Sequence, residues 1–167
     1  MPAFLHGDKI SDDLFDQVWY GVVIRGDKNR IIIGPKSNIQ DRSVLYCSEK
    51  LSTGFPSIID IGSYVTVGHG VILNSCTIRD ESLIGMGSVI SEGSIIDRNS
   101  MVAAGSVVLP NTFIPSGQLW AGNPAKFIRN LTEEELAFLN KVFDYFLCKT
   151  SLLLILGLCY PLQLHSA

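Results

Sequence analysis

Aliphatic residues return at every sixth position along much of the chain, with polar or small residues between them. The longest unbroken run is Ile78, Ile84, Ile90, Ile96, Val102, Val108 and Ile114. Two shorter runs upstream keep the same spacing: Ile61, Val67 and Leu73, and before them Ile33, Ile39 and Leu45. A period of six fits neither the 3.6-residue period of an α-helix nor the two-residue period of one long strand. It is typical of a solenoid in which each hexad supplies one short strand and one corner.

We therefore predict an all-β solenoid, a left-handed parallel β-helix of hexapeptide repeats. Three hexads close one triangular coil, and the aliphatic side chains of successive coils stack inside the prism. Coils are separated by one strand spacing of about 4.8 Å, so about five coils give a prism of roughly 24 Å. Crossovers in hexapeptide β-helices are left-handed, an exception to the usual right-handed rule for parallel strands.

Two interruptions of the period mark candidate functional surfaces. The step from Leu73 to Ile78 is five residues long instead of six, and it follows closely on His69. The gap between Leu45 and Ile61 contains residues 49–56, whose Ser, Gly and Pro content predicts a loop. Such irregularities tend to lie at the binding face of a solenoid.

The pattern changes to that of a helix after Asn130. Thr132 stands three residues before Glu135, which is the spacing of a capping box. An apolar stripe follows at Leu136, Leu139, Phe143 and Phe146. We expect a β-helix domain over 1–130, a C-terminal helix packed on it over 131–150, and an apolar tail over 151–167. The tail has about a dozen apolar residues, fewer than the ~20 that span a bilayer. It either packs on the helix as an altered terminus or contacts protein or membrane, and we favour the second.

The N-terminal end of the solenoid is expected to be capped by another segment, because an uncapped end exposes the edges of its strands. We expect residues 1–18 or a partner to supply it. The first twenty residues contain four aspartates and no arginine, which is unlike a transit peptide or a secretory signal. Any targeting peptide is expected to have been removed or to lie outside this chain.

Composition narrows the range of functions to consider. The net charge is −3 and the Lys and Arg residues are scattered, so direct nucleic-acid binding is not expected. The four cysteines show no C-x-x-C spacing, which argues against a zinc ribbon or a redox pair and favours buried thiols.

Several segments resemble gamma-class carbonic anhydrases. They are WYGVVIRGD at 19–27, NIQD at 38–41, VTVGH at 65–69, LIGMG at 83–87, IPSG at 114–117 and WAGNPAK at 120–126. The resemblance covers roughly residues 19 to 140 and is greatest to the subunits on the membrane arm of mitochondrial respiratory complex I. It implies a trimer of β-helices in which each zinc lies between neighbours, held by two histidines of one subunit and one of the next.

The resemblance also implies three ligand positions, of which this chain keeps one histidine. The ligand after the Gln-Asp pair falls at Tyr46, the next at His69 and the third at Asn74. A catalytic zinc uses three protein ligands and one open position for water. A phenol and a neutral amide bind zinc much more poorly than imidazole does, so we expect a homotrimer to bind zinc weakly or not at all. Zinc is expected only where His69 completes the site of an intact homologue.

Five further residues match polar positions that surround the metal in the family or form an Arg–Asp pair between subunits. They are Arg25, Asp27, Asn38, Gln40 and Asp41. We expect their role here to be mainly structural, because a buried pair at a subunit contact fixes its register even without a metal.

Three functions follow from the sequence. The first is a degenerate gamma carbonic anhydrase-like subunit that assembles with homologous subunits and docks on the membrane arm of complex I, at the matrix side of the mitochondrial inner membrane. The second is a carbonate dehydratase acting through a zinc site shared with a histidine-bearing homologue. The third is a hexapeptide-repeat acyltransferase, against which the Arg-Gly-Asp and Asn-Ile-Gln-Asp segments argue. Metal content separates the first two, and a titration with acetyl-coenzyme A tests the third.

Overall fold

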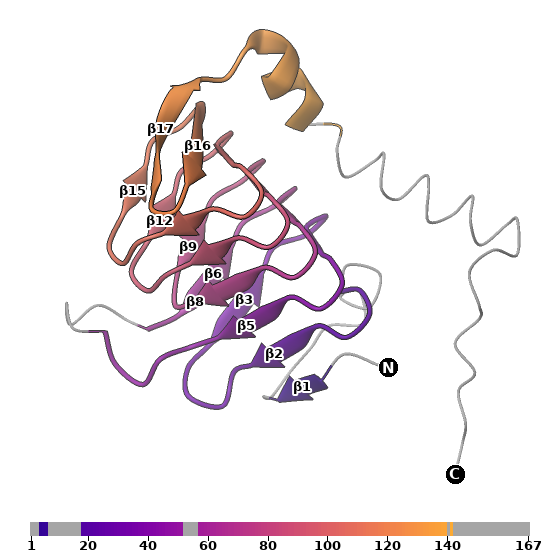
Figure 1. The fold of residues 1–167 in the computed structure, drawn as a ribbon. Coiled ribbons are helices and arrows are strands. Elements are labelled where there is room, and N and C mark those ends of the chain that lie inside the picture. The colour runs from indigo at the N-terminus through magenta and orange to yellow at the C-terminus, as the bar shows by residue number, and fades with distance from the viewer. Residues whose placement is uncertain (1–3, 7–17, 52–56, 140, 142–167) are drawn as a thin grey trace, which may run out of the picture.

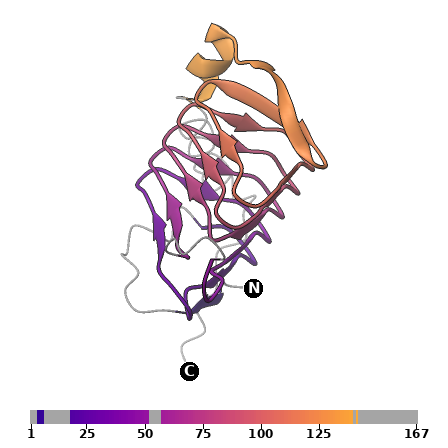
Figure 2. The ribbon, with the colours of Figure 1, turned by 90° about the vertical axis from the view of Figure 1, so that its left-hand side faces the viewer.

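The computed structural model describes residues 4–6, 18–51, 57–139 and 141. In these ranges the chain forms three sheets along the sides of a prism, with strand orders β1-β2-β5-β8-β11-β14, β17-β16-β13-β10-β7-β4 and β15-β12-β9-β6-β3. The coils rise along the prism from the N-terminal strands to the C-terminal hairpin (Figure 1). Figure 2 shows the same stack from the side, with the coils one above another.

The strands are short, as a hexad that also supplies a corner requires. Their bounds are β1 Phe4–His6, β2 Val23–Arg25, β3 Ile31–Ile33, β4 Asn38–Ile39, β5 Val44–Tyr46, β6 Ile59–Ile61, β7 Thr66–Val67, β8 Ile72–Asn74, β9 Thr77–Ile78, β10 Leu83–Ile84, β11 Val89–Ile90, β12 Ile95–Ile96, β13 Met101–Val102, β14 Val107–Val108, β15 Phe113–Ile114, β16 Gln118–Gly122 and β17 Ala125–Asn130. Each strand from β2 to β13 pairs in parallel with the strand three places later in the chain. The predicted parallel β-helix is confirmed.

The residues of the six-residue period form the core. None of the seven in the long run exposes more than 1% of its surface, and Ile61, Val67 and Leu73 are buried to the same degree. Ile33, at the start of the pattern, is half-buried and packs against this core. Burying one aliphatic side chain fully contributes roughly 1.5–3 kcal/mol, so the stack is the main source of stability.

Small residues at the corners let the coils stack closely. Ser88, Ser94 and Ser100 expose none of their surface, and their hydroxyls donate to carbonyl oxygens of the next coil at 3.0, 2.9 and 2.8 Å. At Gly85 a Cβ atom would collide with the backbone of Ala104. Serine thus recurs with the period of six for a physical reason, because it fills a corner and satisfies a buried carbonyl.

An additional strand lies at each end of the stack. Phe4–His6 forms β1, which pairs in parallel with β2, so these residues of the predicted 1–18 cover lie on the edge of one sheet. At the other end β16 and β17 form an antiparallel hairpin, which the sequence analysis did not predict. Gly122, with φ of +106°, lies at its turn, where a glycine is easily accommodated.

A short helix follows the hairpin and begins as the capping box predicts. The Thr132 N–H donates to Glu135 Oε2 at 2.9 Å, and the Glu135 N–H donates to Thr132 Oγ1 at 3.3 Å. Residues 133–139 and 141 are helical, with Leu139 only 3% exposed. Phe143, Phe146, the rest of the predicted 131–150 helix and the apolar tail over 151–167 lie outside the described residues. No helix in the described ranges is long and apolar enough to cross a membrane.

Candidate functional site

The residues that the sequence singled out lie mainly at the two ends of the sheet that contains β2, β5 and β8. One group occupies the last residue of each of these strands, and the other lies in the corners that lead into them. The groups are Arg25, Tyr46 and Asn74 at the ends, and Trp19, Asp41 and His69 in the corners. The members of each group come from successive coils, so the stacking of the coils brings them together.

Arg25, Tyr46 and Asn74 form one column. In the parallel register Arg25 is the partner of Tyr46, and Tyr46 is the partner of Asn74. Neighbouring strands lie about 4.8 Å apart, so these side chains are adjacent on the outside of the prism. The two substituted ligand positions therefore do lie side by side, with Tyr46 36% exposed.

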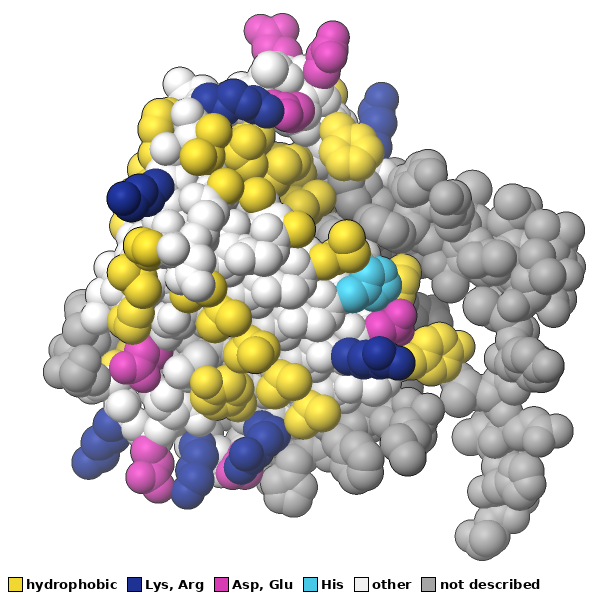
Figure 3. All heavy atoms as spheres, in the orientation of Figure 1, with side chains coloured by type: hydrophobic (Ala, Val, Ile, Leu, Met, Phe, Trp, Pro, Cys, Tyr) yellow, Lys and Arg dark blue, Asp and Glu magenta, His cyan; other side chains and the backbone are white. Residues whose placement is uncertain are grey.

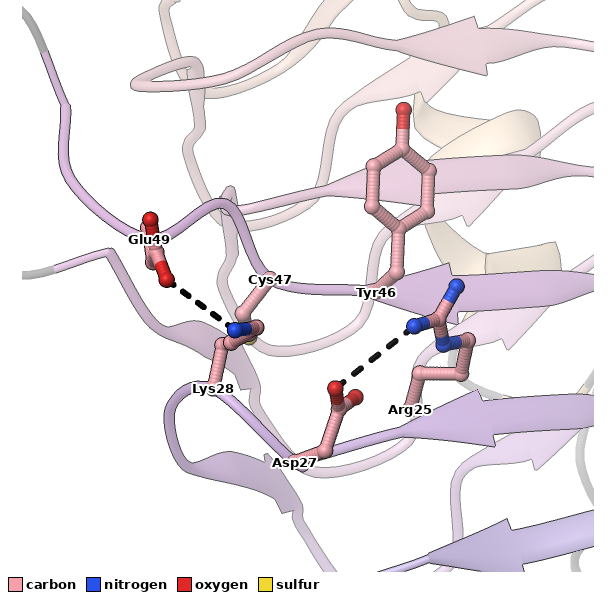
Figure 4. A pocket seen from close by; sticks show the side chains of 6 residues that line it. All are labelled: Arg25, Asp27, Lys28, Tyr46, Cys47 and Glu49. Atoms are coloured by element: carbon pink, nitrogen blue, oxygen red, sulfur yellow. Dashed lines mark hydrogen bonds and ion pairs between the residues drawn. The ribbon is translucent and has the colours of Figure 1, made fainter.

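A pocket of about 300 Å³ opens beside this column. It is lined by Arg25, Asp27, Lys28, Tyr46, Cys47 and Glu49. The Arg25 Nη2 atom lies 3.5 Å from Asp27 Oδ2, and Lys28 Nζ donates to Glu49 Oε1 at 3.0 Å. Figure 4 shows these two ion pairs on one side and the Tyr46 hydroxyl directed away from both. The hydrogen bond that Lys28 donates to Glu49 raises the pKa of Lys28, and the two cations and two carboxylates leave the pocket charge-balanced.

Arg25 and Asp27 thus pair within one chain. The pair between subunits that the resemblance implies for these positions remains a prediction.

Asn74 belongs to a network of hydroxyl groups. Its Oδ1 atom lies 3.0 Å from both Ser48 Oγ and Ser75 Oγ. Ser75 Oγ is also 2.8 Å from Ser57 Oγ and accepts the Ser48 N–H at 2.8 Å. Ser48 Oγ further contacts Glu92 Oε2 at 3.2 Å. Asn74 therefore ties its corner to residues on both sides of the loop predicted at 49–56, of which 52–56 are outside the described ranges.

The five-residue step of the sequence is made in this corner. Ser75 has φ of +43°, a left-handed conformation, and only 2% of its surface is exposed. The shortened corner turns its hydroxyl into the network. The sequence analysis noticed the short step but missed Ser48, Ser57 and Ser75, although the recurrence of serine at corners is a usable signal.

His69 lies in the corner before β8 and is held by two side chains from earlier coils. Its Nδ1 atom is 3.4 Å from Asp41 Oδ2, and the Trp19 ring packs at a centroid distance of 5.7 Å with a tilt of 59°. The imidazole side chain is 42% exposed. Asp41 is itself fixed, because its Oδ1 accepts the Tyr20 N–H at 2.9 Å and its carbonyl accepts the Gly70 N–H at 2.8 Å.

Asn38 and Gln40 are engaged within the chain. Asn38 Nδ2 donates to Thr66 Oγ1 at 3.0 Å, and Gln40 Nε2 donates to Asn38 Oδ1 at 3.3 Å. All three residues are buried. These bonds link β4 to β7 below the corner that carries His69.

The donor set of a single chain does not fit a catalytic zinc. Among the described residues no group of three His, Cys, Asp or Glu side chains could hold a metal ion. His69 lies at the opposite end of the sheet from Tyr46 and Asn74, which offer a phenol and an amide that is already engaged. Imidazole and thiolate are the ligands that structural and catalytic zinc prefers.

The two described cysteines do not change the conclusion about zinc ligands. Cys47 and Cys76 are free and buried, as expected for these two thiols, whereas Cys148 and Cys159 lie outside the described ranges. Burial raises the pKa of Cys76 to about 12, so its thiol stays protonated at neutral pH. The thiolate is the reactive and metal-binding form.

Relatives of known name identify the family. The chain is 52% identical over 134 residues to "Probable carbonic anhydrase" of Methanocaldococcus jannaschii, an alignment that covers 80% of each protein. It is also 52% identical over 118 residues to "Gamma carbonic anhydrase-like 1, mitochondrial" of Arabidopsis thaliana, over 71% of this chain and 47% of that protein. The chain belongs to the gamma carbonic anhydrase family.

The comparison with solved structures agrees with the fold. A crystal structure of a "hexapeptide transferase family protein" from Anaplasma phagocytophilum superposes with a TM-score of 0.73 and 38% identity, covering 80% of this chain and 75% of that one. No family model matches the chain. The gamma carbonic anhydrase chain spans less than half the length of the Arabidopsis relatives that it matches.

Proposed function

We propose that this gamma carbonic anhydrase-like chain is a structural subunit of a trimer formed with homologous subunits. The trimer is attached to the membrane arm of respiratory complex I, at the matrix side of the mitochondrial inner membrane. The observation that carries the proposal is the column of Tyr46 and Asn74, in which the two metal-ligand positions are substituted and Asn74 is engaged by Ser48 and Ser75. A subunit with this column cannot supply the two-histidine half of a zinc site.

An aliphatic ladder on the outside of one sheet supports contact with other subunits. In register across β2, β5, β8, β11 and β14 the outward residues are Val23, Val44, Ile72, Val89 and Val107. Figure 3 shows apolar side chains spread over the visible face, with charged side chains mainly around its margins. Ile72 is 37% exposed and the other four are half-buried, so the ladder forms one continuous apolar strip, the kind of surface that a partner subunit can cover.

The placement in mitochondria is supported by the relatives. The Arabidopsis proteins that match this chain carry the word mitochondrial in their names. The resemblance to complex I subunits, which includes residues 131–135, supports the membrane arm as the docking partner. Contact of the apolar tail at 151–167 with the membrane or with membrane-arm subunits is part of the same proposal.

A second function is favoured by His69. Its imidazole is exposed and held by Asp41, so the chain retains the single-histidine half of a shared site. In a mixed trimer this histidine would complete a zinc site whose other two ligands belong to an intact homologue, and reversible hydration of carbon dioxide would take place there. The chain's own column would remain inactive in the same trimer.

The deciding experiment measures zinc per trimer and subunit composition by native mass on the assembly isolated from mitochondrial membranes. A mixed trimer that migrates with complex I and holds no zinc supports the structural role. One zinc or more, lost together with carbon dioxide hydration in the His69→Ala variant, supports the shared enzyme site. Recovery of the chain free of homologous subunits and of complex I would overturn both.

The acyltransferase alternative has its own test. The solved structures that share the fold include proteins titled as transferases, but the site described above is built from segments of the carbonic anhydrase type. We expect calorimetric titration with acetyl-coenzyme A to give no saturable signal at ligand concentrations up to about 1 mM, the range of weak specific binding. Saturable binding would revive this alternative.

A further inference from the structure

The contacts around His69 bear on which of its two ring nitrogens carries the proton. A neutral imidazole carries one proton on either of two nitrogens, and only the other nitrogen has a lone pair for a ligand. The nitrogen that faces Asp41 is Nδ1, at 3.4 Å from the carboxylate oxygen. A carboxylate only accepts hydrogen bonds, so it favours the form in which Nδ1 carries the proton.

Asp41 is well suited to hold the imidazole in one orientation. Its other oxygen accepts the Tyr20 N–H at 2.9 Å, and its carbonyl accepts the N–H of Gly70, the residue after His69, at 2.8 Å. Asp41 is thus attached at three points, through its carboxylate to Tyr20 and His69 and through its backbone carbonyl to Gly70. The Trp19 ring, at a centroid distance of 5.7 Å, packs against the imidazole and restricts its rotation.

We propose that Asp41 and Trp19 are positioning residues that hold His69 with its proton on Nδ1 and its Nε2 lone pair directed outward. The chain then presents a preformed acceptor nitrogen to a neighbouring subunit. Isolated histidine side chains favour the opposite form, with the proton on Nε2, so the arrangement must be imposed by the protein. Its biological meaning rests on the proposed function, because a shared zinc site would use this lone pair.

The pattern is the one that metal-binding histidines generally require. Such histidines donate their second ring N–H to a carboxylate or carbonyl, which fixes both the tautomer and the direction of the ligand nitrogen. Here that partner is complete within one chain, although the other two ligand positions are lost. Tyr46 and Asn74 have changed, while the support of His69 remains in place.

The test is nitrogen NMR of the imidazole in the full chain, without metal, in alkaline buffer where histidine is neutral. The chain has three histidines, and the His69→Gln variant assigns the signal. We expect the Nδ1–H form of His69 to exceed the Nε2–H form by about ten-fold, the bias that a hydrogen bond to a charged group provides. In Asp41→Asn this ratio should fall to about one or below.

The matched control is Asp80→Asn. Asp80 also lies in an exposed corner and accepts a backbone N–H, that of Ser63 at 2.8 Å, so the control removes the same charge from the same type of setting, away from His69. The tautomer ratio of His69 should not change in this variant. Trp19→Ala removes the ring that packs against the imidazole, so the excess of the Nδ1–H form of His69 should fall in this variant as well.

A dominant Nε2–H form of His69 in the wild-type chain would overturn the inference, even if Asp41→Asn failed to fold. The same tautomer ratio in wild type and Asp41→Asn would also overturn it. The outcome is separate from that of the proposed function. If His69 is in the Nδ1–H form but the trimer holds no zinc, the positioning role stands and the shared zinc site is excluded. If the trimer holds zinc but His69 is in the Nε2–H form, the shared site stands and the positioning role is excluded.

Discussion

Tyr46 and Asn74 are direct partners in the parallel register of β5 and β8, so the two substituted ligand positions of this chain form a single adjacent pair. The resemblance implies histidines at both positions, and the register places a phenol and an amide there side by side. This adjacency makes the assignment of the ligand positions testable by substitution with histidines.

Restoring both histidines should restore metal binding. We expect Tyr46→His with Asn74→His to raise zinc in the purified trimer from near zero toward about one ion per chain, because two imidazoles on adjacent strands would then face the neighbour's His69. Zinc is measured by mass spectrometry of the metal after dialysis. Phe113→His, at an exposed position on another sheet, is the control for non-specific binding by an added histidine. Unchanged zinc content in the double variant would contradict the assignment of the ligand positions.

The Asn74→His change alone should cost stability. It removes the contacts of the amide oxygen with Ser48 and Ser75, and a partly buried hydrogen bond is worth about 1 kcal/mol. Urea unfolding at a fixed protein concentration should show a loss of about 1–2 kcal/mol. A variant as stable as the wild type would show that the hydroxyl network does not anchor this corner.

Alanine substitutions of inward and outward aliphatic residues should differ sharply in their effect on the free energy of unfolding. Ile96 exposes none of its surface, whereas its neighbour Ile95 faces outward and is half-buried. We expect Ile96→Ala to lower the free energy of unfolding by about 3–4 kcal/mol through the cavity it leaves in the stack, and Ile95→Ala to cost less than about 1.5 kcal/mol. Denaturant unfolding of both variants under the same conditions measures the difference, and equal costs would contradict the stacked core.

Two neighbouring glycines should respond differently to alanine. A Cβ at Gly85 would collide with the backbone of Ala104 in the next coil, while a Cβ at Gly87 meets no atom within 4 Å. Gly87 has φ of +67°, so Gly87→Ala pays only the cost of a left-handed backbone, roughly 1–2 kcal/mol. Gly85→Ala must push two coils apart and should prevent normal folding. Thermal melting followed by circular dichroism compares the two variants, and a Gly85→Ala protein that melts with or above Gly87→Ala would disprove the close approach.

The start of the C-terminal helix should depend on pH. Arg129 donates two hydrogen bonds of 2.7 Å to Glu135, and these, with the Thr132 N–H, lower the pKa of Glu135 from 4.5 to about 2. Because the pKa is lower in the folded chain, this stabilisation is complete above about pH 4.5 and is lost as the pH falls toward 2. The protection factors of the amides at Thr132 and over the following turn, which correct for the intrinsic pH dependence of exchange, should therefore fall across this interval.

The Glu135→Gln variant should lack this pH-dependent change, because its amide does not titrate. Glu134→Gln, on the same turn and exposed, is the control and should keep the wild-type profile. Identical profiles for Glu135→Gln and the wild type would assign the change to another group.

The sequence by itself determined the solenoid, its inward-facing residues and the helix cap at Thr132. A period of six repeated over many coils is an additive signal that no single substitution hides, and Ile78 to Ile114 are buried as that period requires. Capping depends on contacts within four residues, so it too can be recognised locally.

Only the tertiary structure decided which polar residues meet. Arg25, Tyr46 and Asn74 are brought together by the register between coils, and that register depends on the loop after β5 and on the short corner at Ser75. The contact of Asp41 with His69 spans 28 positions of the chain and has no local signal, and neither has the antiparallel return of β17. The aliphatic pattern fixes which side chains point inward, but contacts among the outward polar groups are set by how each corner closes.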